Sequence, residues 1–247
     1  MKTLINKKSI LLLTAIMFAS VSHAQWWGGK KVKGNGNMTT ETRTTGDYDG
    51  IKCAGSMDYI LVAGTEGKIK LEGESNLLKH IVTEIKGGNL IVKTEKGISL
   101  SPSWNKTIKI TIPFKDISSV SLAGSGDLWN EDKIAATNFA VSLAGSGDVI
   151  INVDASSVKS SLAGSGDLTI KGSTNDLSAK LAGSGDIHGF GLQANNTTAS
   201  IAGSGDIEIV SNKSLKARIS GSGDIEYKGN PDKEDTKVSG SGSISKD

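Results

Sequence analysis

The tetrapeptide Gly-Ser-Gly-Asp occurs six times in this chain at a nearly constant interval. The copies end at Asp127, Asp148, Asp167, Asp186, Asp206 and Asp224, and a seventh copy ends in Ser243. Successive copies are separated by 21, 19, 19, 20, 18 and 19 residues. A period this short is typical of a stacked array, in which each unit packs only on its two neighbours.

Apolar residues keep to odd offsets from the last residue of each copy. One residue after it stand Leu128, Val149, Leu168, Ile187, Ile207, Ile225 and Ile244, and five before it stand Leu122, Leu143, Leu162, Leu181, Ile201, Ile219 and Val238. Odd offsets place all these side chains on one face of an extended chain. The spacing therefore predicts strands and excludes helices.

The two glycines of each copy share this inward face, where a missing side chain lets the backbone bend and adopt a positive φ. The motif is thus predicted to be a corner, repeated once per rung. Rungs stacked about 4.8 Å apart would form continuous ladders of Leu, Ile and Val. The predicted fold of residues 119–247 is all-β, a right-handed single-stranded β-solenoid of about seven rungs. A β-propeller is disfavoured because its blades need about forty residues each.

The first 24 residues have the pattern of a secretory signal peptide. Its parts are a basic start, an apolar run and a small-x-small cleavage motif: Lys2, Lys7 and Lys8; Ile10 to Ala19; and Ser22-His23-Ala24. Cleavage is expected between Ala24 and Gln25, and the apolar run is too short for a bilayer-spanning helix. We therefore expect an exported chain without a transmembrane anchor, located in the periplasm, on the outer surface or outside the cell.

Charge and cysteine content exclude other classes. The chain has 28 basic and 26 acidic residues, and removal of the signal with its three lysines leaves 28 − 3 = 25 basic residues and a net charge of −1. Such a balance gives no basis for nucleic-acid binding. Cys53 is the only cysteine, so no internal disulfide can form. Cys53 precedes an alternation of apolar and polar residues, which indicates that Cys53 itself is a small buried apolar side chain.

Between the signal and the repeats, residues 25–46 are predicted to be a flexible lead-in that starts with Trp26 and Trp27. Residues 47–118 are predicted to be a less regular β region. Its expected elements are strands at Tyr59–Val62 and Lys68–Glu72, a helical turn at Asn76–His80, a hairpin of Ile81–Ile85 and Leu90–Thr94 around Gly87-Gly88-Asn89, and a strand at Lys106–Ile112 ended by Pro113. Ala54-Gly55-Ser56-Met57-Asp58 reads as a degenerate first copy, which would join both regions in one stack.

The aspartates are the first candidate site. Carboxylates one rung apart, at about 5 Å, repel one another by about 1 kcal/mol per pair in water. Cations between the rungs, hydrogen bonds from nearby Gly and Ser amides, or splaying into solvent would each relieve this repulsion. Calcium needs about six to eight oxygens, more than one aspartate per rung supplies. We therefore predict local acceptors of the Asx-turn kind and no cofactor, with calcium as the alternative.

The outward serines of the motif form a second column: Ser125, Ser146, Ser165, Ser184, Ser204 and Ser222. Their hydroxyls either bond one another along the stack or, with the aspartates, present a polar face that binds a glycan or a cell-surface protein. After the signal only His80 and His188 remain, and no metal-ligand spacing, phosphate loop or nucleophile elbow is present. We therefore predict a non-enzymatic binding module. The alternatives are a purely structural module and a polysaccharide-acting enzyme using Lys180, Asp186 and Arg218.

Several segments together resemble a known family. They are Tyr48-Asp49-Gly50-Ile51-Lys52, Ala54-Gly55-Ser56-Met57-Asp58-Tyr59, Asn76-Leu77-Leu78, Gly88-Asn89-Leu90-Ile91-Val92 and Ile110-Thr111-Ile112-Pro113, followed by the serial Gly-Ser-Gly-Asp copies. This order resembles the putative auto-transporter adhesin, head GIN domain family of bacterial envelope proteins, from about Asp47 to Ser243. The resemblance implies a β-helical fold and a cell-surface or periplasmic setting. It supplies no catalytic residues.

Overall fold

A computed structural model describes residues 29–247 of the chain. The predicted signal peptide, its cleavage site at Ala24 and Gln25, and the Trp26-Trp27 pair lie outside the described residues. The one described helix, α2 (Ser75–Leu78), has four residues, and among residues 29–247 no helix is long and apolar enough to cross a membrane.

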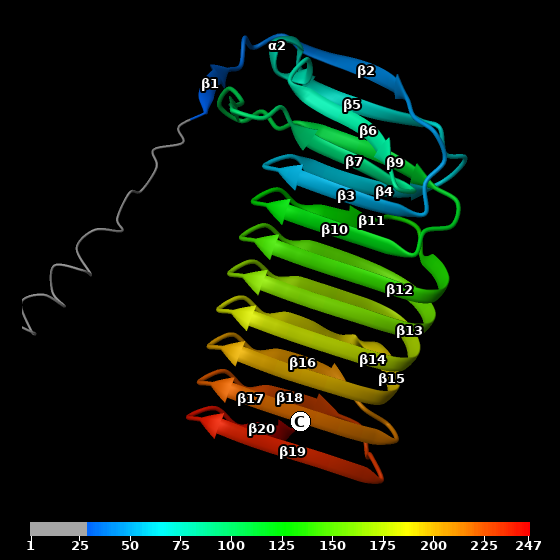
Figure 1. The fold of residues 1–247 in the computed structure, drawn as a ribbon, viewed down its shortest axis with the longest axis vertical. Helices are drawn as coiled ribbons and strands as arrows, with labels where there is room; N and C mark the ends of the chain where they lie inside the picture. Colours follow the sequence, from blue (N-terminus) through cyan, green and yellow to red (C-terminus); the bar gives the residue numbers. More distant parts are fainter. Residues whose placement is uncertain (1–28) are drawn as a thin grey trace, which may run out of the picture.

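The repeats form a β-solenoid of about seven turns, as predicted (Figure 1). Three long strands each run from one corner of the stack to the next: β13 (Val149–Gly164), β14 (Leu168–Gly183) and β15 (Ile187–Gly203). The remaining rungs are built from β10 (Ser119–Gly124), β11 (Leu128–Asn130), β12 (Ile134–Gly145), β16 (Ile207–Val210), β17 (Ser214–Gly221), β18 (Ile225–Lys228), β19 (Lys233–Gly240) and β20 (Ile244–Lys246). Neighbouring rungs pair in parallel with matching residues opposite each other, so Leu143 lies beside Leu162 and Leu162 beside Leu181.

The inward columns of the repeats form the core. Leu122, Leu143 and Leu162 are each 1% exposed, and the column one residue after the aspartate is equally buried through Ile225. Val238 was expected to complete its column but is 40% exposed, because β19 belongs to the last rung and has no rung beyond it. Where polar residues occupy inward positions they find backbone partners; the hydroxyl of buried Thr197, for example, donates to the carbonyl of Val210 at 2.7 Å.

Both glycines of each corner are required by the close stacking of the rungs. The first glycine has a positive φ, +142° at Gly145, which L side chains rarely adopt. A Cβ added at the second, Gly147, would lie 1.9 Å from the carbonyl oxygen of Gly126 in the rung before. The missing Cβ therefore makes room for the neighbouring rung along the stack. The predicted positive φ is thus confirmed at the first glycine, and the close approach of the neighbouring rung is a second requirement that was not predicted.

The degenerate copy forms the first rung of the same stack. β3 (Gly50–Gly55) pairs in parallel with β10, placing Cys53 beside Leu122 and Gly55 beside Gly124, and β4 (Asp58–Ala63) pairs with β11. Met57 replaces the second glycine and is buried. The irregular region and the repeats therefore share one continuous sheet system. Cys53 is buried, as predicted, and burial raises the pKa of its thiol.

A cap covers the N-terminal end of the stack (Figure 1). β7 (Asn89–Thr94) and β9 (Lys109–Phe114) lie in parallel on β3 and β4, and the antiparallel strands β6 (Ile81–Lys86), β5 (Lys68–Glu74) and β2 (Met38–Thr44) follow. Outside this sheet, β1 (Lys30–Lys33) pairs with β8 (Ile98–Ser101). We call β2, β5, α2, β6, β7 and β9 the cap. Leu77, Leu78 and Phe114 are among the buried apolar side chains of its interior.

Two expectations for this region are wrong. The predicted flexible lead-in contains β1 and β2, because β5 offers β2 a free edge with which seven residues pair in antiparallel register. The strand expected to end before Pro113 continues to Phe114. The carbonyl of Phe114 accepts from Gly64, next to β4, so Pro113 faces the opposite edge, where the pairing with β5 has already ended at Thr111. Its missing N–H therefore breaks no ladder bond.

Candidate functional site

The aspartates of the motif form a single hydrogen-bonded column. Each carboxylate accepts the backbone N–H of the corresponding residue one rung further on: Asp127 from Asp148 at 3.1 Å, Asp148 from Asp167 at 3.2 Å, Asp167 from Asp186 at 3.2 Å, Asp186 from Asp206 at 2.8 Å, Asp206 from Asp224 at 2.7 Å, and Asp224 from Ser243 at 2.6 Å. In each case the acceptor is the Oδ1 atom. The other carboxylate oxygen takes part in no hydrogen bond with residues 29–247.

The predicted local Asx turn is therefore wrong, because the partner lies in the next rung. At each corner the Ser amide donates to the first Gly carbonyl of the preceding rung, and at most corners the second Gly amide shares that acceptor; the amides of Ser146 and Gly147, for example, lie 2.9 and 3.2 Å from the oxygen of Gly124. The aspartate amide has no backbone carbonyl left within this pattern, and the carboxylate supplies the missing acceptor. Charge-assisted bonds of this kind offset the repulsion along the column.

The column begins in the degenerate rung. Asp58 accepts the backbone N–H of Asp127 and a hydrogen bond from Thr107. Burial and the neighbouring carboxylate of Asp127 raise the pKa of Asp58. At the other end, Ser243 donates both its amide and its hydroxyl to Asp224.

The serine side chains of the motif, unlike the aspartate carboxylates, do not link neighbouring rungs. All six, from Ser125 to Ser222, are exposed. Within the described part of the chain their hydroxyls form no hydrogen bond with protein atoms, so the expected bonding between stacked serines is not seen. The predicted polar face thus consists of free hydroxyls beside aspartates whose Oδ1 atoms are occupied.

A longer polar surface lies on the side of the stack that precedes the corners. Two hollows of about 510 and 400 Å³ share Lys159 and Ser178, so they form one groove. The groove crosses β3, β10, β12, β13, β14, β15, β17 and β19 and is lined mainly by Ser, Thr, Asn and Lys. Its charged residues are Lys52, Lys159, Lys180, Lys216, Lys233, Asp176, Glu234 and Asp235, five basic against three acidic. We call this surface the groove.

Of the three residues imagined for an enzyme, two lie on the groove side and one does not. Lys180 lines the groove, and Arg218 stands in the same column two rungs further on, where its guanidinium binds the carboxylate of the groove residue Asp235. Asp186 lies at the corner, in a cluster with Asp167 and His188. The structure thus brings Asp186 together with a histidine that the sequence interpretation had left without a role.

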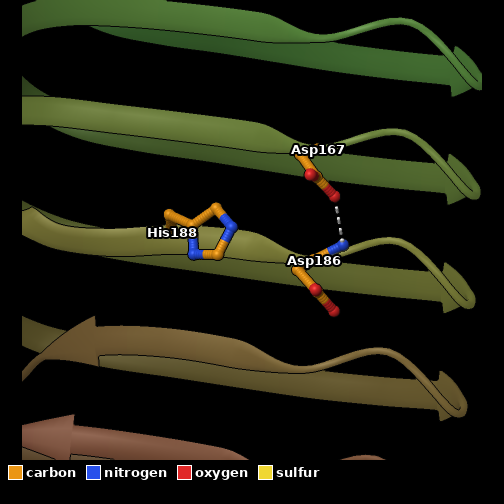
Figure 2. Close-up of side chains that lie close together, drawn as sticks. All are labelled: Asp167, Asp186 and His188. Atoms are coloured by element: carbon orange, nitrogen blue, oxygen red, sulfur yellow. Dashed lines mark hydrogen bonds between the residues drawn. The ribbon is translucent and has the colours of Figure 1, made fainter.

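In that cluster, one ligand atom of each side chain lies within 4.8 Å of the others (Figure 2). Among the described residues this is the one group of three or more His, Cys, Asp or Glu side chains so arranged. On its other side, Nδ1 of His188 lies 3.2 Å from Oε2 of Glu208. The sequence held the signal, since His188 and Glu208 each stand two residues after the aspartate of their copies.

One aromatic residue is almost fully exposed among residues 29–247, on a loop that leads into the cap. Trp104 is 97% exposed, on the loop between β8 and β9. The loop is fixed from beneath by Glu74, which is 1% exposed and accepts the N–H and hydroxyl of Ser103 at 2.8 and 2.6 Å. These bonds hold the pKa of Glu74 below its usual range.

Comparison with known proteins gives a consistent result. Residues 47–231 match the model of the putative auto-transporter adhesin, head GIN domain family. A putative adhesin from Bacteroides fragilis has a similar structure, with a TM-score of 0.80 and 23% identity over 87% of this chain and 100% of that one. A protein from Parabacteroides distasonis, titled a putative lipid binding protein, has a TM-score of 0.71 and 30% identity over 88% of this chain and 100% of that one.

A putative adhesin from Parabacteroides merdae has a TM-score of 0.68 and 23% identity over 88% of this chain and 99% of its own. A comparison with curated proteins found no match. The family match covers most of the chain, from just before the first rung to the loop before β19. The chain belongs to the putative auto-transporter adhesin, head GIN domain family.

Proposed function

We propose that the chain is an adhesin-like module of the bacterial envelope that binds an anionic glycan along the groove. The observation that carries the proposal is the groove itself. It is open, runs along the stack, is lined mainly by Ser, Thr, Asn and Lys, and carries more lysines than acids. Solenoid proteins commonly bind their partners on such extended surfaces.

The register of the strands favours a linear polymer as the ligand. Lys159, Ser178, Thr198 and Lys216 stand opposite one another on four successive rungs. Polar groups therefore recur at a constant rise along the groove, as sugar units recur along a glycan. The family relatives titled adhesins and the predicted signal peptide support an envelope setting.

Two lysines of one strand provide a matched test. Lys180 lines the groove, whereas Lys171, also in β14, is exposed and lies outside it. In a binding assay against immobilised acidic and neutral polysaccharides, we expect Lys180→Glu to weaken binding to the acidic ones at least about tenfold, because it reverses a charge in the groove. Lys171→Glu is expected to bind like the unmodified chain.

A second variant blocks the groove sterically. Ser178 belongs to both hollows, so Ser178→Trp should obstruct the groove at its middle. Failure of the unmodified chain to bind any polysaccharide or cell would favour the purely structural alternative. Release of new reducing ends or unsaturated sugars from the same panel would favour the enzymatic alternative. Equal loss of binding in Lys180→Glu and Lys171→Glu would place the ligand elsewhere.

A further inference from the structure

We propose that Asp167, Asp186 and His188 form a binding site for a divalent first-row transition-metal ion, with Zn²⁺ as the representative. The site lies at a corner of the stack, apart from the groove, and it does not depend on the proposed glycan binding. The cluster in Figure 2 combines two carboxylates from adjacent rungs with one imidazole.

The aspartate column holds the two carboxylates in place. Oδ1 of Asp167 accepts the amide of Asp186, and Oδ1 of Asp186 accepts the amide of Asp206. Each carboxylate is thereby oriented by the backbone of the next rung and keeps Oδ2 free. Ligating carboxylates in metal sites are usually held by such additional hydrogen bonds.

Glu208 orients the imidazole in a similar way. Its Oε2 lies 3.2 Å from Nδ1 of His188, so the proton of the neutral ring is placed on Nδ1 and Nε2 is left as the lone-pair donor. In Figure 2 one ring nitrogen faces the two aspartates, and with Nδ1 directed to Glu208 this nitrogen is Nε2. A carboxylate on the far nitrogen is the common partner of a metal-bound histidine.

The distances suit a small ion. Tetrahedral metal bonds of about 2.0–2.2 Å to nitrogen and oxygen place the ligand atoms about 3.3–3.6 Å apart. The three ligand atoms already lie within 4.8 Å of one another, and small rotations of these surface side chains bring them to that separation. Three protein ligands would leave at least one position for water or an external ligand, the arrangement of an open site.

The donor set selects the class of metal. Imidazole nitrogen with carboxylate oxygen suits zinc, nickel, copper and cobalt, whereas calcium prefers oxygen donors alone and about six to eight of them. Only one rung carries a histidine at the position next to the aspartate column. In the column two residues after the aspartate stand Trp129, Ile150, Thr169, His188, Glu208, Glu226 and Ser245, and His188 is its one imidazole.

The test is a calorimetric zinc titration of the chain purified without a histidine tag and stripped with chelator. We expect one zinc per chain, and His188→Ala should weaken binding at least about tenfold. Asp186→Asn, which keeps Oδ1 as acceptor for Asp206, should do the same, and Glu208→Gln should weaken binding about 10–100-fold. His80→Ala and Asp148→Asn are the matched controls, since each removes the same chemical group elsewhere; His23 is common to all variants.

Cobalt provides a second readout that does not depend on stability. Co²⁺ bound through Nε2 should give a visible d–d absorption band in the unmodified chain and in both controls, and the band should be absent in His188→Ala. The proposal is overturned if the unmodified chain shows no saturable zinc binding at millimolar zinc, or if His188→Ala binds zinc as tightly as the unmodified chain does.

Discussion

The repeats and the cap pair their strands in different ways: neighbouring rungs of the repeats pair in parallel, whereas the cap adds the antiparallel pairs β2–β5, β5–β9 and β6–β7. In the repeats, two glycines per corner allow close contact between neighbouring backbones, and the core is a ladder of mainly aliphatic side chains. In the degenerate first rung Met57 replaces one of those glycines, and the antiparallel strands of the cap cover that end of the stack. The difference shows that propagating a stack and ending it require opposite sequence properties: strict repetition in one case, and irregular sequence with antiparallel pairing in the other.

The strongest way to break the repeat core is to place a charge in its ladder. Leu181 is 3% exposed, and Leu181→Asp should lower the free energy of unfolding by at least about 4 kcal/mol, because the carboxylate has no partner there. Val238 occupies the same column in the last rung and is 40% exposed, so Val238→Asp should cost less than about 1 kcal/mol. Urea unfolding of both variants measures the contrast, and equal losses would contradict the proposed column.

The corner glycines come next. Gly147→Ala should cost about 3 kcal/mol or more, because its Cβ would lie 1.9 Å from the Gly126 oxygen, which is itself held by the stack. Gly46→Ala is the control, since its Cβ would meet only Ile85, at 3.7 Å, and its φ is ordinary. Thermal melts of the two variants compare a stacked corner with a connecting loop. An unchanged melting temperature in Gly147→Ala would show that the rungs are not in close contact.

Two substitutions in the aspartate column distinguish the effect of charge on stability from the effect of hydrogen bonding. Asp148→Ala leaves the amide of Asp167 without its acceptor and should cost about 1 kcal/mol. Asp148→Asn keeps Oδ1 and removes one repelling charge, so it should be neutral or slightly stabilising. The pair distinguishes an acceptor role from a charge role by the difference in unfolding midpoint. Loss of stability in the asparagine variant alone would show that the negative charge is needed.

The cap should respond to acid through Glu74. Because the folded-state pKa of Glu74 lies below its ordinary 4.5, the carboxylate stabilises the fold fully above that value, and the stabilisation disappears as the pH falls through the folded-state pKa. Glu74→Gln should therefore melt lower than the unmodified chain at neutral pH. The difference in melting temperature should shrink in strong acid, and a constant difference across this range would argue against the mechanism.

The smallest expected effect is that of calcium. Each column carboxylate already uses Oδ1 for an amide, and the remaining oxygens are too few for calcium's usual six to eight ligands. Millimolar calcium after chelator treatment should therefore leave the melting temperature unchanged, whereas zinc should raise it by binding the folded state. A large rise with calcium would reassign the column as a calcium site.

The period and the odd offsets were enough to predict the rungs, the buried columns and the degenerate copy at Ala54–Asp58, because parallel stacking repeats whatever one rung does. The hairpin of β6 and β7 was also readable, from Gly87 and Gly88 between two alternating runs. The pairing of β2 with β5 could not be read, because antiparallel partners distant in sequence leave no periodic trace.

The candidate sites were less predictable for a related reason. The sequence shows that aspartates lie in a column, but the acceptor geometry depends on the rise and tilt between rungs, which composition does not encode. The groove depends on the packing of outward side chains from many rungs. The proximity of His188 to Asp167 depends only on strand register. It could have been predicted from the sequence, because the two copies are aligned residue by residue at that point.

The one-directional bonding of the aspartate column has a consequence for how such chains change in length. Every copy brings one amide to the rung before it and one carboxylate to the rung after it, so a whole copy can be inserted or removed without orphaning either group. Tandem duplication of about twenty codons would thus lengthen the rod by one rung, about 4.8 Å, and leave the cap untouched. The length of the rod can then change in equal steps during evolution.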